Sequence, residues 1–280
     1  MIVQEQGDQL VLIRQTDHAV LAGFFAHGWG NELFKRPEPF DSLSLAASEH
    51  DNGWREWELQ PRIDPKTRTP YSFMSLPTDE HIALYQRGIE RVVKSDHYAG
   101  LLVNLHAAGL YDRARATMPG YSAKYIKSAE TDQVNAFLQA LKLQQLRLKV
   151  DLRANTATKN YTDEKLLAAH AKLLEALDRL SLYFCMGGAQ DATIDGVPMD
   201  DQGTEVDLEL RPMGLNTVAV GPYPFRKEPL QVSILMRRVA KRMYTNSEDF
   251  QKTLAHSEYT AVNFTLHAGG ALTAKRFAVA

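Results

Sequence analysis

Apolar residues recur at helical spacing through the first two thirds of the chain. Rows with the spacing i, i+3, i+4, i+7 place their side chains on one face of a helix. The longest of these rows runs through Leu167, His170, Leu174, Leu177, Ser181 and Cys185. Such rows predict helices at about residues 16–29, 40–52, 78–94, 96–109, 123–155 and 162–186.

The pattern changes towards both ends of the chain. Residues 206–210 and 262–266 alternate apolar with polar side chains, as half-buried strands do, and residues 231–235 form a third candidate strand. Residues 2–13 are typical of a hairpin around a turn at Gly7-Asp8. We therefore expect an α+β fold, in which a mainly α-helical bundle carries a small antiparallel sheet built from the N-terminal hairpin and the C-terminal strands.

The length of the chain bounds its domain organisation. With 280 residues and a hydrophobic content of 44%, the chain can bury a large core. We expect residues 1–190 to hold the hairpin and a helical core. Residues 191–280 are expected to form a β-rich subdomain that packs on this core, so that the chain is one integrated unit.

Charge and cysteine content exclude several classes of protein. A formal net charge of −2 provides neither a basic surface for nucleic acid nor a polybasic anchor for anionic lipid. Cys185 is the single cysteine, and its place in an apolar row favours a core residue. The N-terminus lacks the features of a signal peptide, and no apolar run approaches membrane-spanning length. We expect a soluble, cytoplasmic protein that binds neither nucleic acid nor membranes. Assembly into a homo-oligomer is compatible with the sequence.

Polar side chains interrupt several of the apolar faces. The most informative are His50 and Asp51, because Asn52-Gly53 follows them and is typical of the end of a helix. The pair would then lie at the negative end of the helix dipole, where a cation is favoured. The other polar positions of this kind are His18, His81, His106 and Asp178.

These side chains indicate a metal site. A single buried histidine is more often a hydrogen-bonded core residue than a ligand, and we expect this of His170, which shares a face with Asp178. Two buried carboxylates without a cation, however, would be energetically expensive. Four imidazoles and two carboxylates without a thiolate suit Fe, Mn, Zn, Co or Ni. The pattern therefore predicts one or two divalent metal ions bound by His18, His50, Asp51, His81, His106 and Asp178.

The order of these residues resembles the HD-domain superfamily of metal-dependent enzymes. The shared order is one His, then His-Asp, then two further His, and a distant Asp in a helix that reads Leu-Asp-Arg-Leu. This resemblance implies an HD-like helical core with one or two ions at its centre, and the separation of His81 from His106 is similar to that in the dinuclear members. Nearly the whole chain also resembles a bacterial family known only as a domain of unknown function, through residues 15–18 (QTDH), 50–57 (HDNGWREW) and 221–225 (GPYPF).

Three functions are compatible with these resemblances. Most HD-domain enzymes are phosphohydrolases, which implies a metal-activated water that attacks a small anionic substrate. Asp51 or Asp178 would bridge or anchor the ions, and Arg55 or Arg87 would neutralise the phosphate. The alternative is a dinuclear-iron oxygenase, because residues 15–18 are similar to a Gln-x-Glu-His stretch of the phosphonate-cleaving oxygenases. A non-catalytic metal- or ligand-binding protein is the third hypothesis. Against hydrolysis, the sequence has no Gly-rich phosphate loop and no helix with clustered Lys and Arg.

The stretch from Trp54 to Pro77 contains four prolines after its first residues and is predicted to be a loop. A long ordered loop beside a site often acts as a lid. Arg55 lies four residues after Asp51 and is the basic side chain best placed to bind an anion, although a surface ion pair with Glu56 or Glu58 is the alternative. We expect this loop to form a wall or lid over the open coordination positions.

Overall fold

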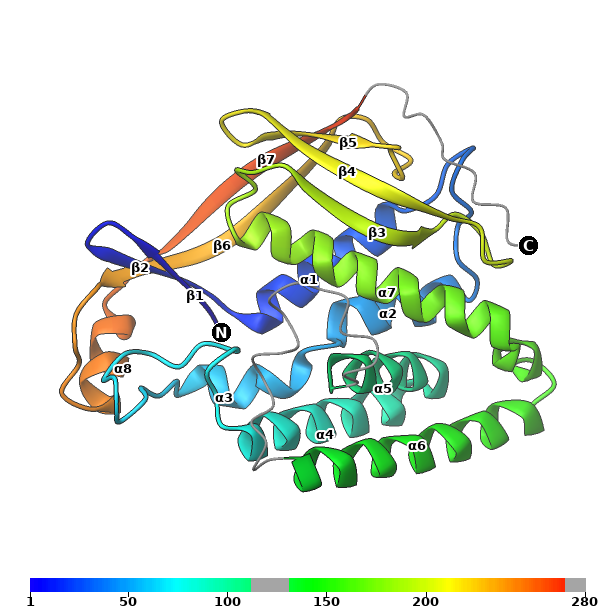
Figure 1. Ribbon diagram of the computed structural model, residues 1–280, viewed down its shortest axis with the longest axis horizontal. Helices are drawn as coiled ribbons and strands as arrows, with labels where there is room; N and C mark the ends of the chain where they lie inside the picture. Colours follow the sequence, from blue (N-terminus) through cyan, green and yellow to red (C-terminus); the bar gives the residue numbers. More distant parts are fainter. Residues whose placement is uncertain (112–130, 270–280) are drawn as a thin grey trace.

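The computed structural model describes residues 1–111 and 131–269, and it places a twisted sheet against layers of helices (Figure 1). In this part of the chain the sheet has seven strands in the order β1-β2-β6-β7-β5-β4-β3. β5 and β7 are parallel, whereas the other neighbours are antiparallel. The strands are β1 (Ile2–Gln6), β2 (Gln9–Ile13), β3 (Ala192–Pro198), β4 (Glu205–Gly214), β5 (Thr217–Gly221), β6 (Leu230–Ala240) and β7 (Tyr259–Ala268).

The expected mainly helical bundle with a small antiparallel sheet is wrong, because the sheet is large and mixed. The predicted strands exist, and the N-terminal hairpin joins the sheet through β2 and β6. β3 and β5 were not predicted. β3 carries a register shift between Ile194 and Val197, with Gly196 at φ +64°, so its apolar positions lose the two-residue period. In β5 the run Val218-Ala219-Val220 is apolar throughout, so the sequence hides an alternation in which Val218 and Val220 are buried.

The helices lie on one side of the sheet, and α1 and α7 contact both the sheet and the other helices (Figure 1). Phe25 of α1 and Phe184 of α7 have ring centroids 5.8 Å apart, and Phe184 lies 5.2 Å from Phe264 of β7. The described helices are α1 (Gln15–Gly28), α2 (Phe40–Glu49), η1 (Asn52–Trp54), α3 (Arg55–Leu59), α4 (Thr78–Ser95), α5 (His97–Tyr111), α6 (Thr131–Ala154), η4 (Lys159–Thr162), α7 (Glu164–Cys185) and α8 (Ser247–Ala255).

Most helix predictions are confirmed to within a few residues. The helix predicted at 40–52 ends at Glu49 and is followed by a turn of 3-10 helix. The helix predicted at 123–155 is seen as α6, and the predicted residues 123–130 lie outside the described residues. The apolar row on α7 faces the core along its whole length, because its members from Leu167 to Cys185 are buried.

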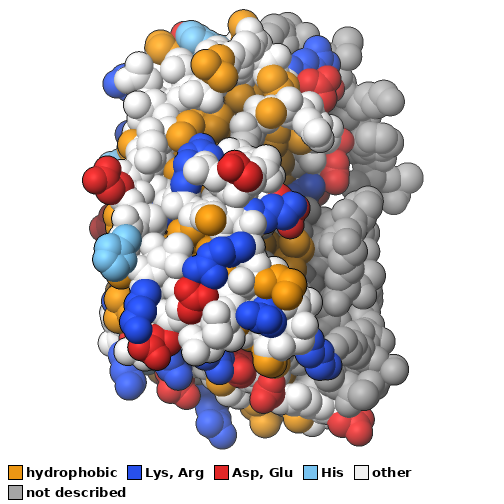
Figure 2. Space-filling model, turned by 90° about the vertical axis from the view of Figure 1, so that its left-hand side faces the viewer, with side chains coloured by type: hydrophobic (Ala, Val, Ile, Leu, Met, Phe, Trp, Pro, Cys, Tyr) orange, Lys and Arg blue, Asp and Glu red, His pale blue; other side chains and the backbone are white. Residues whose placement is uncertain are grey.

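Acidic and basic side chains are mixed on the face that carries the N-terminal hairpin and α8 (Figure 2). Lys241 pairs with Glu5 at 2.5 Å, and Arg242 pairs with Asp249 at 2.7 Å. Among the described residues, none of the helices is long and apolar enough to cross a membrane.

Candidate metal centre

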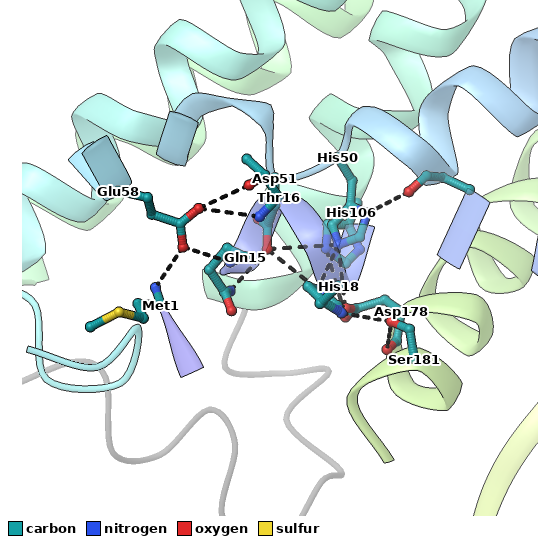
Figure 3. Close-up of polar contacts among 11 residues, drawn as sticks. Met1, Gln15, Thr16, His18, His50, Asp51, Glu58, His106, Asp178 and Ser181 are labelled. Carbon is teal, nitrogen blue, oxygen red and sulfur yellow. Dashed lines mark hydrogen bonds and ion pairs between the residues drawn. The ribbon is translucent and has the colours of Figure 1, made fainter. Parts of the chain in front are cut away.

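Three parts of the chain bring His18, His50, Asp51 and Asp178 to one point (Figure 3). His18 lies in the first turn of α1, His50 and Asp51 directly follow α2, and Asp178 lies in α7. Asp178 Oδ1 is 3.2 Å from His18 Nε2 and 3.4 Å from His50 Nε2, and Asp51 Oδ2 is 3.4 Å from His18 Nε2. All four side chains are buried.

Hydrogen bonds fix both imidazoles with their Nε2 atoms towards this point. His50 Nδ1 lies 2.8 Å from the carbonyl oxygen of Ala47, so it must donate. His18 Nδ1 lies 2.6 Å from Ser181 Oγ, which donates its own hydrogen to the carbonyl oxygen of Asp178. A neutral imidazole carries one N–H, so each Nε2 presents a lone pair. The two Nε2 atoms are 3.1 Å apart, an arrangement that only a cation or a proton can stabilise.

The electrostatics of the centre also call for positive charge. Burial lowers the pKa of His18, but Asp178 and Asp51 outweigh this effect and raise it to about 9. Burial would raise the pKa of Asp178, yet His18 and His50 hold it well below its usual range. The pKa of Asp51 is lowered against burial for the same reason. Both carboxylates therefore remain anionic, and either protons or a metal ion must balance them.

One carboxylate oxygen has no partner of its own. Asp51 Oδ2 accepts a hydrogen bond from Gln15 Nε2 at 2.9 Å, whereas Asp51 Oδ1 is buried and has no hydrogen-bond partner in the part of the chain that the structure describes. Buried polar atoms without partners are rare and often mark a bound ion. The donor set, two imidazole nitrogens and two carboxylates, is a common one for divalent transition metals. These buried groups could therefore hold a metal ion.

The two further predicted histidines differ in position. Potential ligand atoms of His50, His106 and Asp178 lie within 4.8 Å of one another, as do those of His18, His50 and Asp51. His81 belongs to neither group. Its Nδ1 makes a hydrogen bond with the hydroxyl of Tyr111, and its ring lies against Trp54, with centroids 5.6 Å apart.

A pocket adjoins the centre and contains His81 in its wall. The described residues that line it are Gln15, Asp51, Phe73, His81, Tyr85, His106, Leu110, Tyr111 and Asp178. Of the predicted lid, residues 55–59 form the short helix α3, and Phe73 is the part of the loop that reaches the pocket. Five of the six predicted ligands thus converge, and His81 lies beside them.

The turn that carries His50 and Asp51 is held against α4 by close packing. A Cβ atom on Gly53 would lie 1.9 Å from the carbonyl oxygen of Leu84, so the approach requires glycine. Arg91 of α4 donates to the carbonyl oxygen of Asn52 at 3.0 Å. These contacts fix the position of Asp51 relative to the helices.

Glu58 is a structural residue of the site that the sequence did not reveal. It is buried and accepts hydrogen bonds from the backbone N–H groups of Gln15, at 2.6 Å, and Thr16, at 3.3 Å. A carboxylate at this position satisfies the free N–H groups at the start of α1, the helix that carries His18. No motif marks Glu58, because its partner lies 43 residues earlier in the chain.

Arg55, the predicted substrate-binding residue, lies outside the pocket. Its side chain is 54% exposed, and the guanidinium pairs with Glu49 at 3.3 Å, rather than with Glu56 or Glu58. Arg87 pairs with Glu56 at 3.6 Å on the surface. The structure therefore does not bring either arginine to the candidate centre.

Comparison with known proteins shows the family to which the chain belongs. A buried His and Asp cluster that could hold a metal ion defines the kind of site. The chain belongs to the family described as "Protein of unknown function (DUF3891)", whose model matches residues 1–241. The resemblance to a family of unknown function is thereby confirmed, whereas membership of the HD-domain superfamily stays a prediction. No curated protein and no solved structure matches the chain.

Proposed function

We propose that this protein is a metal-dependent hydrolase related to the HD-domain enzymes, with an ion held by His18, His50, Asp51 and Asp178. The observation that carries the proposal is the convergence of two imidazole Nε2 atoms and two carboxylates in a buried place, with the Nε2 atoms 3.1 Å apart. A divalent ion bound there would supply a Lewis acid that lowers the pKa of water to about 7.

The residues around the ion have separate tasks. Ala47 and Ser181 hold His50 and His18 in the orientation that directs Nε2 towards the ion. Gln15 holds Asp51 by a hydrogen bond to Oδ2. His106 lies 3.9 Å from Asp178 Oδ2, and burial lowers its pKa to about 4, so it is uncharged at neutral pH and able to ligate.

The geometry favours hydrolysis over the dinuclear-iron alternative. The resemblance to the dinuclear HD-domain members implies that a second ion would use His81 together with His106, and His81 is outside both groups of converging ligand atoms among the described residues. A single ion suits the activation of one water molecule. The non-catalytic hypothesis differs from both because it predicts bound metal without turnover.

The test begins with elemental analysis of protein purified without added metal. We expect about one equivalent of a transition metal per chain in the wild type and metal-dependent hydrolysis of a p-nitrophenyl ester or phosphate after reconstitution with Zn²⁺, Mn²⁺, Co²⁺ or Fe²⁺. Asp51→Ala should lose the metal, and Asp51→Asn should recover part of the stability that the alanine variant loses. Equal metal contents in wild type and Asp51→Ala would refute the proposal.

A further inference from the structure

Gln15 lies beside the candidate metal centre and is fixed at both ends. Its backbone N–H donates to Glu58 Oε1, and its side-chain Nε2 donates to Asp51 Oδ2 (Figure 3). The residue is only 2% exposed. Because a carboxylate only accepts hydrogen bonds, the amide nitrogen must face Asp51, and the amide oxygen Oε1 must point away from it.

Two buried acceptors therefore belong to the same pocket. Among the described residues, neither Gln15 Oε1 nor Asp51 Oδ1 has a hydrogen-bond partner, and both residues line the pocket beside the centre. A buried acceptor is unfavourable until a donor reaches it. A ligand that brings an N–H or O–H group into the pocket satisfies this requirement.

Apart from the carboxylates of Asp51 and Asp178 and two histidines, the rest of the described pocket wall is uncharged. Phe73, Tyr85, Leu110 and Tyr111 provide aromatic and apolar surface. No Lys or Arg is present among the described lining residues.

A phosphate group is a poor match for these surroundings. One divalent ion is already balanced by the carboxylates of Asp51 and Asp178. The buried polar atoms beside Gln15 that lack a partner among the described residues are acceptor oxygens, Gln15 Oε1 and Asp51 Oδ1, and these repel the oxygens of an anion. An uncharged or cationic donor is attracted by the same oxygens.

We propose that Gln15 is a specificity-determining residue, whose Oε1 accepts a hydrogen bond from a hydroxyl or amine group of a small substrate without negative charge. The apolar part of that substrate packs against Phe73, Tyr85 and Tyr111. This inference rests on the proposed hydrolase, because it places the substrate beside the same ion, and it replaces the anionic substrate expected from the sequence.

The test uses three probes that share one ring: benzyl alcohol, benzylamine and benzyl phosphate. Their dissociation constants are measured by ligand-observed NMR on the full chain, with and without Zn²⁺. We expect the alcohol and the amine to bind about tenfold more tightly than the phosphate. Gln15→Met, which keeps the size of the side chain but removes the acceptor, should weaken both by about five- to tenfold.

Gln6→Met is the matched control, because Gln6 is exposed at the end of β1, away from the pocket, and should leave all three affinities unchanged. Tighter binding of benzyl phosphate, or equal binding of benzyl alcohol by wild type and Gln15→Met, would overturn the inference. If Gln15→Met does not fold, Gln15→Glu keeps an acceptor at this place and should bind benzylamine at least as well as wild type does.

The same measurements distinguish failure of the proposed hydrolase from failure of the specificity proposed for Gln15. Protein that binds no Zn²⁺ but still prefers benzyl alcohol through Gln15 would remove the metal function and leave the donor-binding role of Gln15. Protein that binds Zn²⁺ and prefers benzyl phosphate would keep the metal function and remove the specificity proposed for Gln15.

Discussion

Two buried clusters combine histidine with an acid, and α7 contributes one residue to each, His170 to the first and Asp178 to the second. These two residues are about two turns apart on the helix, and the clusters differ in how their charges are balanced. In the first, His170 Nδ1 lies 2.8 Å from the hydroxyl of Tyr98, and Nε2 lies 3.7 Å from Asp201. Asp201 also pairs with Lys35, so one carboxylate meets one ammonium group. In the second, Asp178 and Asp51 face two imidazoles, and no described Lys or Arg pairs with either carboxylate.

This difference separates a core histidine from a candidate ligand. Both clusters place histidine on the apolar face of a helix next to an acid, so the histidine alone does not distinguish them. The two clusters are distinguished by the number of their carboxylates compared with the number of Lys or Arg side chains that pair with them. A cluster with two buried carboxylates and no ammonium or guanidinium group needs an additional cation, whereas the His170 cluster is already neutral.

Neutralising one acid in each cluster gives the largest expected contrast. Asp178→Asn should lower metal affinity by more than about 100-fold, since it removes a charged ligand whereas loss of a supporting group alone costs 10–100-fold. The matched variant Asp201→Asn should keep the metal of the wild type. Metal content after dialysis, measured by mass spectrometry, checks both. A wild-type metal content in Asp178→Asn would place the ion elsewhere.

Gly53, in the turn that follows Asp51, should be the most sensitive backbone position near the centre. Gly53→Ala places a methyl group against the backbone of Leu84, and we expect it to lower the free energy of unfolding by about 3 kcal/mol, the range of strong overpacking. The control is Gly109→Ala in α5, where a Cβ meets nothing within 4 Å and the helix should gain about 0.5–1 kcal/mol. Denaturant unfolding measures both. Equal stability of the two variants would contradict the close packing at Gly53.

Removal of metal should destabilise the protein through one cluster only. A ligand present at 100 times its dissociation constant stabilises the folded state by about 2.7 kcal/mol. For a chain of this size that corresponds to a fall in melting temperature of about 5 °C after EDTA treatment. Asp178→Asn should show no further fall with EDTA, and Asp201→Asn should respond as wild type does. An identical EDTA response in all three proteins would show that the metal that stabilises the fold is not bound by Asp178.

The His170 cluster should make the free energy of unfolding depend on pH. Burial lowers the pKa of His170 from 6.5 to about 4, so below pH 6.5 the unfolded chain takes up a proton before the folded chain does. Stability should therefore be complete above pH 6.5 and fall as the pH decreases towards 4, by on the order of 2 kcal/mol for this group. His170→Gln should flatten this part of the profile. Urea unfolding at pH 7 and pH 4.5 measures the difference, and parallel profiles would show that His170 does not carry it.

The candidate site was more predictable from the sequence than the fold was. His18, His50, Asp51 and Asp178 interrupt apolar rows, and the cost of burying their charges marks them without a structure. The size of the sheet was not predictable in this way, because the bulge at Gly196 breaks the period of β3. Contacts between distant segments, such as Glu58 with the start of α1, leave no local pattern at all.

Arg55 offers the smallest expected effect, and it tests where an anion can bind. The sequence places Arg55 four residues after Asp51, yet its side chain is half exposed and paired with Glu49. Exposed ion pairs contribute about 0–1 kcal/mol, so Arg55→Ala should change the free energy of unfolding by less than about 0.5 kcal/mol. Metal content and the affinity for inorganic phosphate should equal those of the wild type, because the guanidinium does not line the pocket. A clear loss of phosphate affinity in Arg55→Ala, with the metal retained, would show that Arg55 leaves Glu49 to bind the substrate and would restore the anionic substrate class.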